Sequence, residues 1–185
     1  LDAWYPGQEG GNAIADVLFG DFNPAGRLPV SVPKSLGQIP VYYNYWFPNR
    51  RDYVETDAKP LYPFGYGLSY SEFKYSDLKV ATSGKGRNTK IEISLKVSNT
   101  SKVDGDEVIQ LYIRDMVSTV LSPVKQLRAF ERVSIKAGKT KTVQFELLPK
   151  ELSLFDTEMK QKVQAGEFKL MIGASSEDIR LETTF

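Results

Sequence analysis

Three acidic residues, Asp104, Asp106 and Glu107, lie close enough in the sequence to suggest a catalytic carboxylate pair or a calcium site. Their spacing does not fit a calcium-binding loop. Asp104-Gly105 is also a common turn dipeptide, and Asp106 and Glu107 then begin an alternating apolar pattern. We therefore favour a turn followed by a strand over a metal site or a catalytic pair.

The composition excludes several other kinds of chemistry. The 185 residues include no histidine and no cysteine, so Ser-His-Asp and Cys-His catalysis, disulfides and thiolate metal sites are impossible within the chain. Lys and Arg number 24 against 23 Asp and Glu, which leaves a net charge of +1. That balance gives no electrostatic basis for binding nucleic acid or an anionic membrane, and we expect neither as a partner. We expect no cofactor and no metal.

A glycine-rich stretch, PGQEGG at residues 6–11, precedes an apolar pattern with helical spacing. Helix N-termini attract phosphate, so the stretch is a candidate anion site. However, no Lys-Ser or Lys-Thr follows Gly11, and Glu9 would repel a phosphate. We favour a tight strand-to-helix turn. The preceding residues then predict a strand end, and Gly20 predicts the end of the helix.

Aromatic residues gather at positions 42–47, with the sequence YYNYWF. Aromatic faces pack on the C–H groups of sugars, so this stretch is a candidate sugar-stacking platform, although burial or an interdomain contact is the favoured interpretation. A long loop is predicted over residues 46–59. The side chains that could contribute to the rim of a substrate site there are Trp46, Arg50, Arg51 and Tyr53; a solvated loop is the favoured alternative.

From residue 72 onwards apolar residues occur at every second position, which predicts half-buried strands. The clearest is residues 90–99, where Ile91, Ile93, Leu95 and Val97 alternate with polar residues. Slips of the apolar phase between Tyr75 and Leu78, and again within residues 125–135, predict two β-bulges. About seven short antiparallel strands over residues 72–185, with a helical turn at residues 149–152, indicate a fibronectin III-like or immunoglobulin-like sandwich.

Residues 61–70, LYPFGYGLSY, combine four aromatic residues with two glycines and a proline and carry no charge. A flexible linker would instead be rich in Gly and Ser or charged, so we expect a rigid apolar joint. The predicted organisation is therefore an α/β-type remnant with a long loop at 1–60, an aromatic interdomain joint at 61–71, and a β-sandwich at 72–185. The fold class is mainly β, with the sandwich preceded by a remnant of an α/β sandwich domain.

Three ordered motifs carry a resemblance to a known family. Residues 6–44, beginning PGQEGGNAIADVLFGDFNPAGRLPVSVPKSLGQIP, resemble the end of the second domain of glycoside hydrolase family 3 enzymes. PLYPFGYGLSYSEF is similar to the connection into their C-terminal fibronectin III-like domain, and SPVKQLRAFERVSIKAGKTKTVQFEL to the middle strands of that domain. The resemblance covers nearly the whole chain and extends to the bacterial periplasmic β-glucosidase type.

The resemblance implies a larger parent built from a (β/α)8-type barrel, an α/β sandwich domain and the fibronectin III-like domain. Such enzymes are retaining exo-acting β-glycosidases that use two carboxylates about 5–5.5 Å apart. An Asp on the barrel is the nucleophile, and a Glu on the α/β domain usually serves as acid/base. No SDW-type barrel signature occurs here, and the acid/base segment would precede Leu1, so we assign no catalytic residue to this chain.

Two functional hypotheses follow. In the first, the chain is the non-catalytic C-terminal part of a β-glycosidase acting on β-linked oligosaccharides or glycosides in carbohydrate metabolism, with the sandwich as a scaffold. Its partners are then the missing N-terminal catalytic domains, and its location is periplasmic or secreted. The lone βα unit would leave apolar surface exposed, which predicts oligomerisation, including a homo-oligomer, or poor solubility. The alternative is a free-standing carbohydrate- or protein-binding β-sandwich module.

Overall fold

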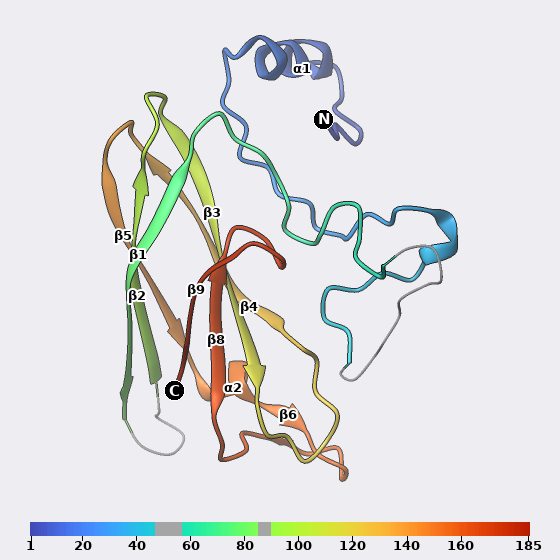
Figure 1. Ribbon diagram of the computed structural model, residues 1–185, viewed down its shortest axis with the longest axis vertical. Coiled ribbons are helices and arrows are strands. Elements are labelled where there is room, and N and C mark those ends of the chain that lie inside the picture. Colours follow the sequence, from blue (N-terminus) through green and yellow to red (C-terminus); the bar gives the residue numbers. More distant parts are fainter. Residues whose placement is uncertain (47–56, 85–89) are drawn as a thin grey trace.

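A computed structural model describes residues 1–46, 57–84 and 90–185 of the chain (Figure 1). Two antiparallel sheets form the main body. The first has the strand order β1-β2-β5 and contains β1 (Phe73–Ser83), β2 (Lys90–Asn99) and β5 (Thr140–Leu147). The second has the order β4-β3-β8-β9 and contains β3 (Gly105–Asp115), β4 (Gln126–Ile135), β8 (Phe168–Gly173) and β9 (Ile179–Thr184). The predicted β-sandwich is confirmed.

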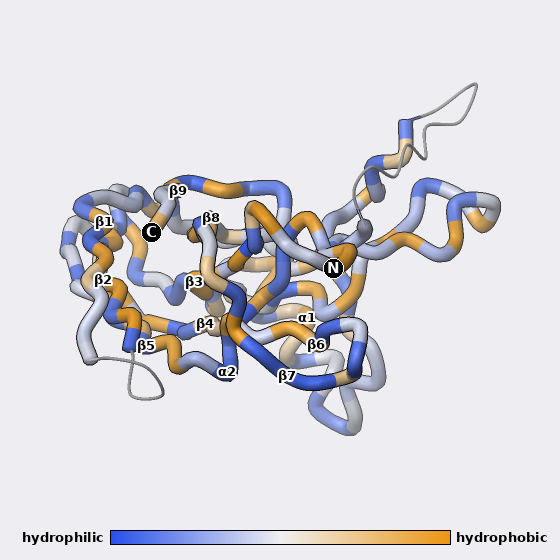
Figure 2. Tube along the Cα trace, turned by 90° about the horizontal axis from the view of Figure 1, so that it is seen from below, coloured by the Kyte–Doolittle hydropathy of each residue, from blue (hydrophilic) through white to orange (hydrophobic). Residues whose placement is uncertain are grey.

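The core lies between the two sheets, where the alternating apolar residues meet. In β2 the inward residues Ile91, Ile93, Leu95 and Val97 are all buried, while the residues between them are exposed or half-buried. Figure 2, which looks at the sandwich from below, shows hydrophobic and hydrophilic residues alternating along the tube. Central strand β3 differs because Gln110 and Tyr112, on its outer face, are buried as well. Something outside the sandwich must therefore cover that face.

Both predicted bulges are present. The β1–β2 register shifts between Ser76 and Lys79, where the apolar phase slips in the sequence. In β4, Ala129 pairs with Leu111 and Leu127 pairs with Tyr112, so Arg128 is the extra residue. A bulge bends its strand and redirects the side chain of the extra residue, and this affects the surface next to β4.

The chain between β5 and β8 forms a small satellite that closes one end of the sandwich. The predicted helical turn is α2 (Pro149–Leu152), whose Glu151 carboxylate accepts the Leu148 backbone N–H at 2.8 Å. It is followed by a short hairpin of β6 (Leu154–Phe155) and β7 (Gln161–Lys162), which the sequence pattern did not predict. Two-residue strands are too short to produce an alternating pattern.

The N-terminal segment, residues 1–46 and 57–71, has little regular structure. Helix α1 (Gly10–Phe19) ends at Gly20 in the left-handed conformation, as predicted, and a 3-10 turn, η1 (Leu36–Gln38), follows. The predicted strand end before α1 is wrong: residues 1–9 contain no strand, because no neighbouring strand is present to pair with them. The Gly7–Gly10 turn itself is present, with the Gly10 N–H bonded to the Gly7 carbonyl at 3.2 Å.

Two stretches of the N-terminal segment run side by side along the sandwich (Figure 1). Backbone hydrogen bonds join Leu28 to Tyr66 and to Gly65, and Val32 to Tyr62. Helix α1 lies beyond the end of the sandwich, and its apolar residues Leu18 and Phe19 are exposed. Within the described residues, no helix is long and apolar enough to cross a bilayer.

Candidate functional site at the junction between the N-terminal segment and the sandwich

The predicted rim residues are only partly described. Arg50, Arg51 and Tyr53 lie outside the described residues. Trp46 is half-exposed and forms an isolated antiparallel bridge with Pro123, which leads into β4. Its assignment to a substrate rim stays a prediction.

The acidic residues singled out in the sequence have separate structural roles. Asp104 accepts the Ala137 backbone N–H at 2.8 Å and so closes the turn between β4 and β5 against the start of β3. Asp106 lies 2.6 Å from the Arg132 guanidinium on the neighbouring strand. A hydrogen bond from Ser134, followed by that from Arg132, lowers the pKa of Asp106 below its ordinary value. Neither carboxylate is placed for catalysis.

Glu107 is the centre of a buried polar cluster at one end of the core. It shares the inward face of β3 with Ile109, and only 1% of its surface is exposed. Its carboxylate accepts the Tyr75 hydroxyl at 2.7 Å and a hydrogen bond from the Arg27 guanidinium, also at 2.7 Å. Burial, and then the negative charge of Glu107, raise the pKa of Tyr75 well above its ordinary value.

Arg180 closes the other side of this cluster. Its guanidinium lies 3.8 Å from the Glu107 carboxylate and 4.8 Å above the Tyr75 ring, and it also binds Asp178 and the Phe73 carbonyl. Tyr75, Glu107 and Arg180 thus come from three strands of the sandwich, whereas Arg27 enters from the N-terminal segment. An interior carboxylate needs a cation and hydrogen bonds to remain charged, and Arg27 supplies the closer of the two cations, at 2.7 Å against 3.8 Å for Arg180.

Asn23 makes a second polar connection between the same two parts. Its side-chain nitrogen donates to the Ser71 hydroxyl and to the Asp104 carbonyl, each at 2.9 Å. Its oxygen accepts from the Ser69 hydroxyl and the Tyr70 N–H, each also at 2.9 Å. Asn23 therefore uses four hydrogen bonds to hold the stretch after α1, the start of the sandwich and the β3 turn together.

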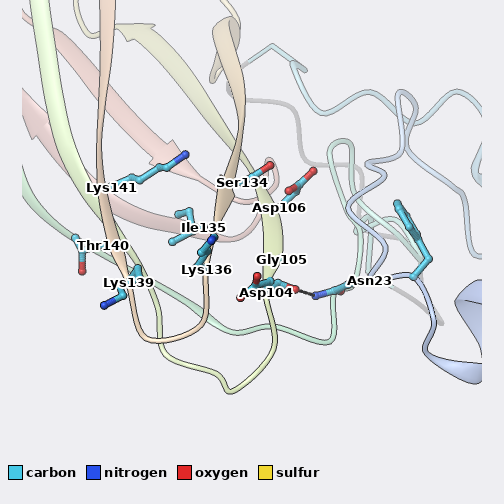
Figure 3. A pocket seen from close by; sticks show the side chains of 11 residues that line it. Asn23, Asp104, Gly105, Asp106, Ser134, Ile135, Lys136, Lys139, Thr140 and Lys141 are labelled. Atoms are coloured by element: carbon cyan, nitrogen blue, oxygen red, sulfur yellow. Dashed lines mark hydrogen bonds between the residues drawn. The ribbon is translucent and has the colours of Figure 1, made fainter.

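Figure 3 shows Asn23 reaching across to Asp104 at the edge of a shallow cavity of about 690 Å³. Lys136, Lys139 and Lys141 also line the cavity. These lysines come from the exposed end of the β4–β5 hairpin and do not converge on a common point in the figure. The cavity is thus a by-product of the Asn23 connection.

Gln110 makes a third connection, on the outer face of β3. Its amide nitrogen donates to the Gly65 carbonyl at 3.0 Å and the Ala174 carbonyl at 2.7 Å, and its oxygen accepts the Tyr112 hydroxyl at 2.5 Å. Gly65 has φ +79°, and a Cβ there would lie 2.0 Å from the Gln110 oxygen. Glycine is required at this position for both reasons.

Aromatic rings complete the cover over β3. Tyr43 stacks on Phe64 with ring centroids 4.2 Å apart and meets the edge of Tyr112 at 5.9 Å. The Ser176 N–H also bonds to the Phe64 carbonyl at 2.9 Å. Burial raises the pKa of Tyr112 above its ordinary value. These contacts explain why both faces of β3 are buried. Within LYPFGYGLSY they involve Phe64 and Gly65, whereas Tyr62 and Tyr70 are 42% and 51% exposed, contrary to the expected burial of the aromatic residues.

The sequence pattern does not predict the long-range hydrogen bonds of Asn23, Arg27 and Gln110. Each has its partners at least 40 residues away along the chain, apart from the Gln110–Tyr112 contact, and sequence periodicity carries no information on such pairs. One signal was available for Glu107, since it is in phase with Ile109, Leu111 and Ile113. An acidic residue on the core face of a strand implies a buried partner.

The junction can position two parts of a protein, but it holds no group that is free for acid/base or nucleophilic chemistry. Its carboxylate, phenol and guanidinium groups are engaged with one another. Among the residues that the structure describes, no three acidic side chains come together in a way that could hold a metal ion.

Comparison with known proteins gives two family matches. Residues 1–70 match the glycosyl hydrolase family 3 C-terminal domain, and residues 107–176 match the fibronectin type III-like domain. Arg27 lies within the first match and Glu107 within the second. Their ion pair therefore joins two family domains.

Curated relatives align over nearly the whole chain. It is 43% identical to the periplasmic beta-glucosidase of Salmonella typhimurium, covering 97% of this chain and 25% of the relative. It is 41% identical to a putative beta-xylosidase of Formosa agariphila, covering 100% of this chain and 24% of the relative. The chain thus spans about a quarter of the length of the curated relatives it matches.

Solved structures agree with this alignment. A b-glucosidase from Erythrobacter marinus has a TM-score of 0.92 at 42% identity, over 100% of this chain and 24% of that one. A beta-glucosidase from Listeria innocua in complex with glucose has a TM-score of 0.88 at 36% identity, over 99% of this chain and 27% of that one. The arrangement of the N-terminal segment on the sandwich is therefore shared with both.

Proposed function

The chain belongs to glycoside hydrolase family 3, and we propose that it is the non-catalytic C-terminal part of a retaining exo-acting β-glycosidase. The observation that carries this proposal is the junction, where Arg27 inserts from the family 3 domain into the buried end of the fibronectin III-like domain. Its polar groups bind one another and leave none in a position to act on a glycosidic bond. The sandwich then serves as a scaffold that orients the domain bearing Arg27.

The exposed apolar surface near the N-terminus supports a docking role for residues 1–22. Trp4, Tyr5, Leu18, Phe19 and Phe22 are all at least half exposed. So many large exposed apolar side chains within 22 residues are typical of an interface. We propose that it packs against the remainder of an α/β domain in the longer protein. Without that domain we expect the chain to oligomerise.

The substrate class follows from the named relatives, which include beta-glucosidases and beta-xylosidases. We propose β-linked glycosides or oligosaccharides as substrates of the longer protein, and carbohydrate metabolism as its role. A periplasmic or secreted location is supported by the relative named a periplasmic beta-glucosidase. The domain boundaries we propose are 1–60, 61–71 and 72–185, with the joint as the middle part.

A panel of aryl β-glycosides tests this proposal directly. The purified chain and the longer parent protein are assayed side by side for release of the aryl alcohol. We expect cleavage by the parent alone, and the preferred sugar in the panel then identifies the glycoside. Cleavage by the isolated chain would contradict the proposal, and Asp104, Asp106 and Glu107 would be the first residues to replace.

A further inference from the structure

A second cleft, separate from the cavity beside Asn23, lies between residues 42–46, the loop before β4, and the α2–β6 satellite. Its volume is about 720 Å³, within the roughly 300–1,000 Å³ range that is usual for small-ligand sites. Three aromatic side chains line one wall: Tyr42 is 61% exposed, Trp46 51% and Tyr45 37%. None of them is needed to fill the core, so their exposure within a cleft needs another explanation.

Backbone contacts hold this aromatic wall in place. The Val124 N–H donates to the Tyr45 carbonyl at 2.9 Å, and Trp46 forms its antiparallel bridge with Pro123. The Leu127 N–H donates to the Tyr43 hydroxyl at 3.2 Å, and Tyr43 is itself stacked on Phe64. The rings are therefore carried on a stretch that is anchored to the start of β4. A wall held in this way binds a ligand at a low entropic cost.

Polar groups line the opposite side of the cleft. Arg128, the extra residue of the β4 bulge, has a buried Nε atom without a hydrogen-bond partner among the described residues. Asp115, at the end of β3, uses one oxygen for the Val117 N–H at 3.1 Å, and its other oxygen is buried and likewise without a partner in the described part of the chain. Buried polar atoms without partners are rare, and a polar ligand in this cleft would supply a partner to both.

This combination matches the chemistry of a neutral carbohydrate. Sugar rings present C–H faces that pack on aromatic rings, while their hydroxyls both donate and accept hydrogen bonds. Arg128 donates through Nη2 to the Gln126 oxygen and keeps its Nε donor. Asp115 keeps one acceptor oxygen, and the Asn44 amide carries both a donor and an acceptor. Asp115 and Arg128 carry opposite charges, and Lys150, which also lines the cleft, lies 3.4 Å from the Glu151 carboxylate, so the cleft has no large excess of either charge.

We propose that this cleft is a non-catalytic binding site for a β-linked oligosaccharide, with Trp46 and Tyr42 as the stacking residues and Arg128 and Asp115 as the polar anchors. The choice of β-linked sugars rests on the proposed function of the longer protein. The site holds an oligosaccharide chain outside the catalytic domains. It thereby raises the local concentration of chain ends for an exo-acting enzyme.

Calorimetric titration of the 185-residue chain with cellotetraose and xylotetraose tests the proposal, with the α-linked maltotetraose as the sugar control. We expect saturable binding of at least one β-linked tetrasaccharide. Trp46→Ala should weaken it at least about tenfold, because a central aromatic ring contributes much of the binding energy. The matched control is Trp4→Ala, since Trp4 is 63% exposed, does not line the cleft, and should leave the affinity unchanged.

Three results would overturn the proposal. The first is the absence of saturable binding by the unsubstituted chain up to about 10 mM sugar. The second is equal affinity in the Trp46→Ala and Trp4→Ala variants; if Trp46→Ala fails to fold, Tyr42→Ala replaces it, because truncating an exposed ring does not disturb the core. The third is tetrasaccharide binding to an inactivated form of the longer protein that Trp46→Ala leaves unchanged although it weakens binding to the chain, which would show that a protein segment covers the cleft.

Failure here is separable from failure of the proposed function. The tetrasaccharide titration reports binding to the cleft, whereas the aryl glycosides report hydrolysis by the parent. A parent that hydrolyses aryl β-glycosides normally, with no tetrasaccharide binding to the 185-residue chain, would remove the cleft and leave the proposed function in place.

Discussion

Replacing Glu107 with glutamine keeps the size of the side chain but removes the charge that holds Arg27. The side chain of Glu107 is 2% exposed and that of Arg27 is 10% exposed, so water cannot take the place of the lost partner. Glu107 accepts from Arg27 through one oxygen and from Tyr75 through the other, so glutamine replaces one of these acceptors by a donor nitrogen and leaves an uncharged oxygen in place of the other. The Arg27 Nε and Nη1 atoms already lack partners among the described residues, so the substitution leaves the buried cation without its carboxylate.

The expected cost follows from the burial of the pair. Removing one partner of a buried ion pair typically costs about 3–5 kcal/mol. Arg27→Met should cost less, because Glu107 keeps the Tyr75 hydroxyl at 2.7 Å and the Arg180 guanidinium at 3.8 Å. The double variant removes both charges, so we expect its cost to fall about 1–3 kcal/mol below the sum of the two single costs.

Asp106 provides a matched control one residue away on the opposite face of β3. Its partner Arg132 is 55% exposed, so Asp106→Asn should cost only about 0.2–1 kcal/mol. Urea unfolding followed by far-UV circular dichroism gives the free energies of unfolding. Thermal melts should show Glu107→Gln lowering the midpoint by roughly 10 °C. Equal costs for Glu107→Gln and Asp106→Asn would refute the claim that the Arg27–Glu107 pair holds the two domains together.

Two further predictions use the joint and the pKa of a buried phenol. Gly65→Ala should lower the free energy of unfolding in urea by about 2–5 kcal/mol, because it adds left-handed backbone strain to a collision with Gln110. Gly138→Ala is the control: its φ is +67° and nothing lies within 4 Å of its Cβ, so it should cost only about 1–2 kcal/mol. Similar costs would argue against the close contact at Gly65. The raised pKa of Tyr75 means that the folded state holds this proton more tightly than the unfolded state, so the stability it contributes is complete below pH about 10 and is lost as the pH rises further. In an alkaline titration followed at 295 nm, Tyr75→Phe should therefore lower by one, out of the 10 tyrosines, the number that ionise only on unfolding; an unchanged number would mean that Tyr75 is accessible to solvent.

The sandwich was predictable because its information is local. The alternation of apolar residues in β2 and the phase slips in β1 and β4 each involve about ten consecutive residues. In the structure the alternating residues of β2 are buried, and the pairing register of β1 and β4 shifts at the slips. The end of α1 was also predictable, since Gly20 terminates a helix without help from elsewhere. The strand expected before α1 was wrong because strand formation depends on a neighbouring strand, which no local pattern can supply.

The junction was not predictable in the same way, because its key contacts are long-range and polar. Arg27 and Glu107 are 80 residues apart, and Asn23 and Asp104 are 81 residues apart. The aromatic character of LYPFGYGLSY predicted an apolar joint, but in the described part of the chain only Phe64 stacks on a ring of the segment before it, Tyr62 and Tyr70 are exposed, and the choice of partners depends on hydrogen-bond geometry in the folded chain. The sugar-stacking interpretation of YYNYWF was the less favoured one, and the cleft beside Trp46 is the reason to test it.

The physical roles of apolar and polar contacts at the junction differ. Tyr43, Phe64 and Tyr112 bury area against one another, but stacked rings can slide over a short distance at little cost. The hydrogen bonds of Asn23, Gln110 and Arg27 are directional, and a shift of one residue would break all three sets and leave Gln110 and Arg27 buried without these partners. The apolar contacts thus supply adhesion, and the polar contacts select one orientation. A scaffold that must present an attached domain in a single orientation requires both, and the Glu107→Gln variant separates them because it removes a polar contact while leaving the aromatic contacts intact.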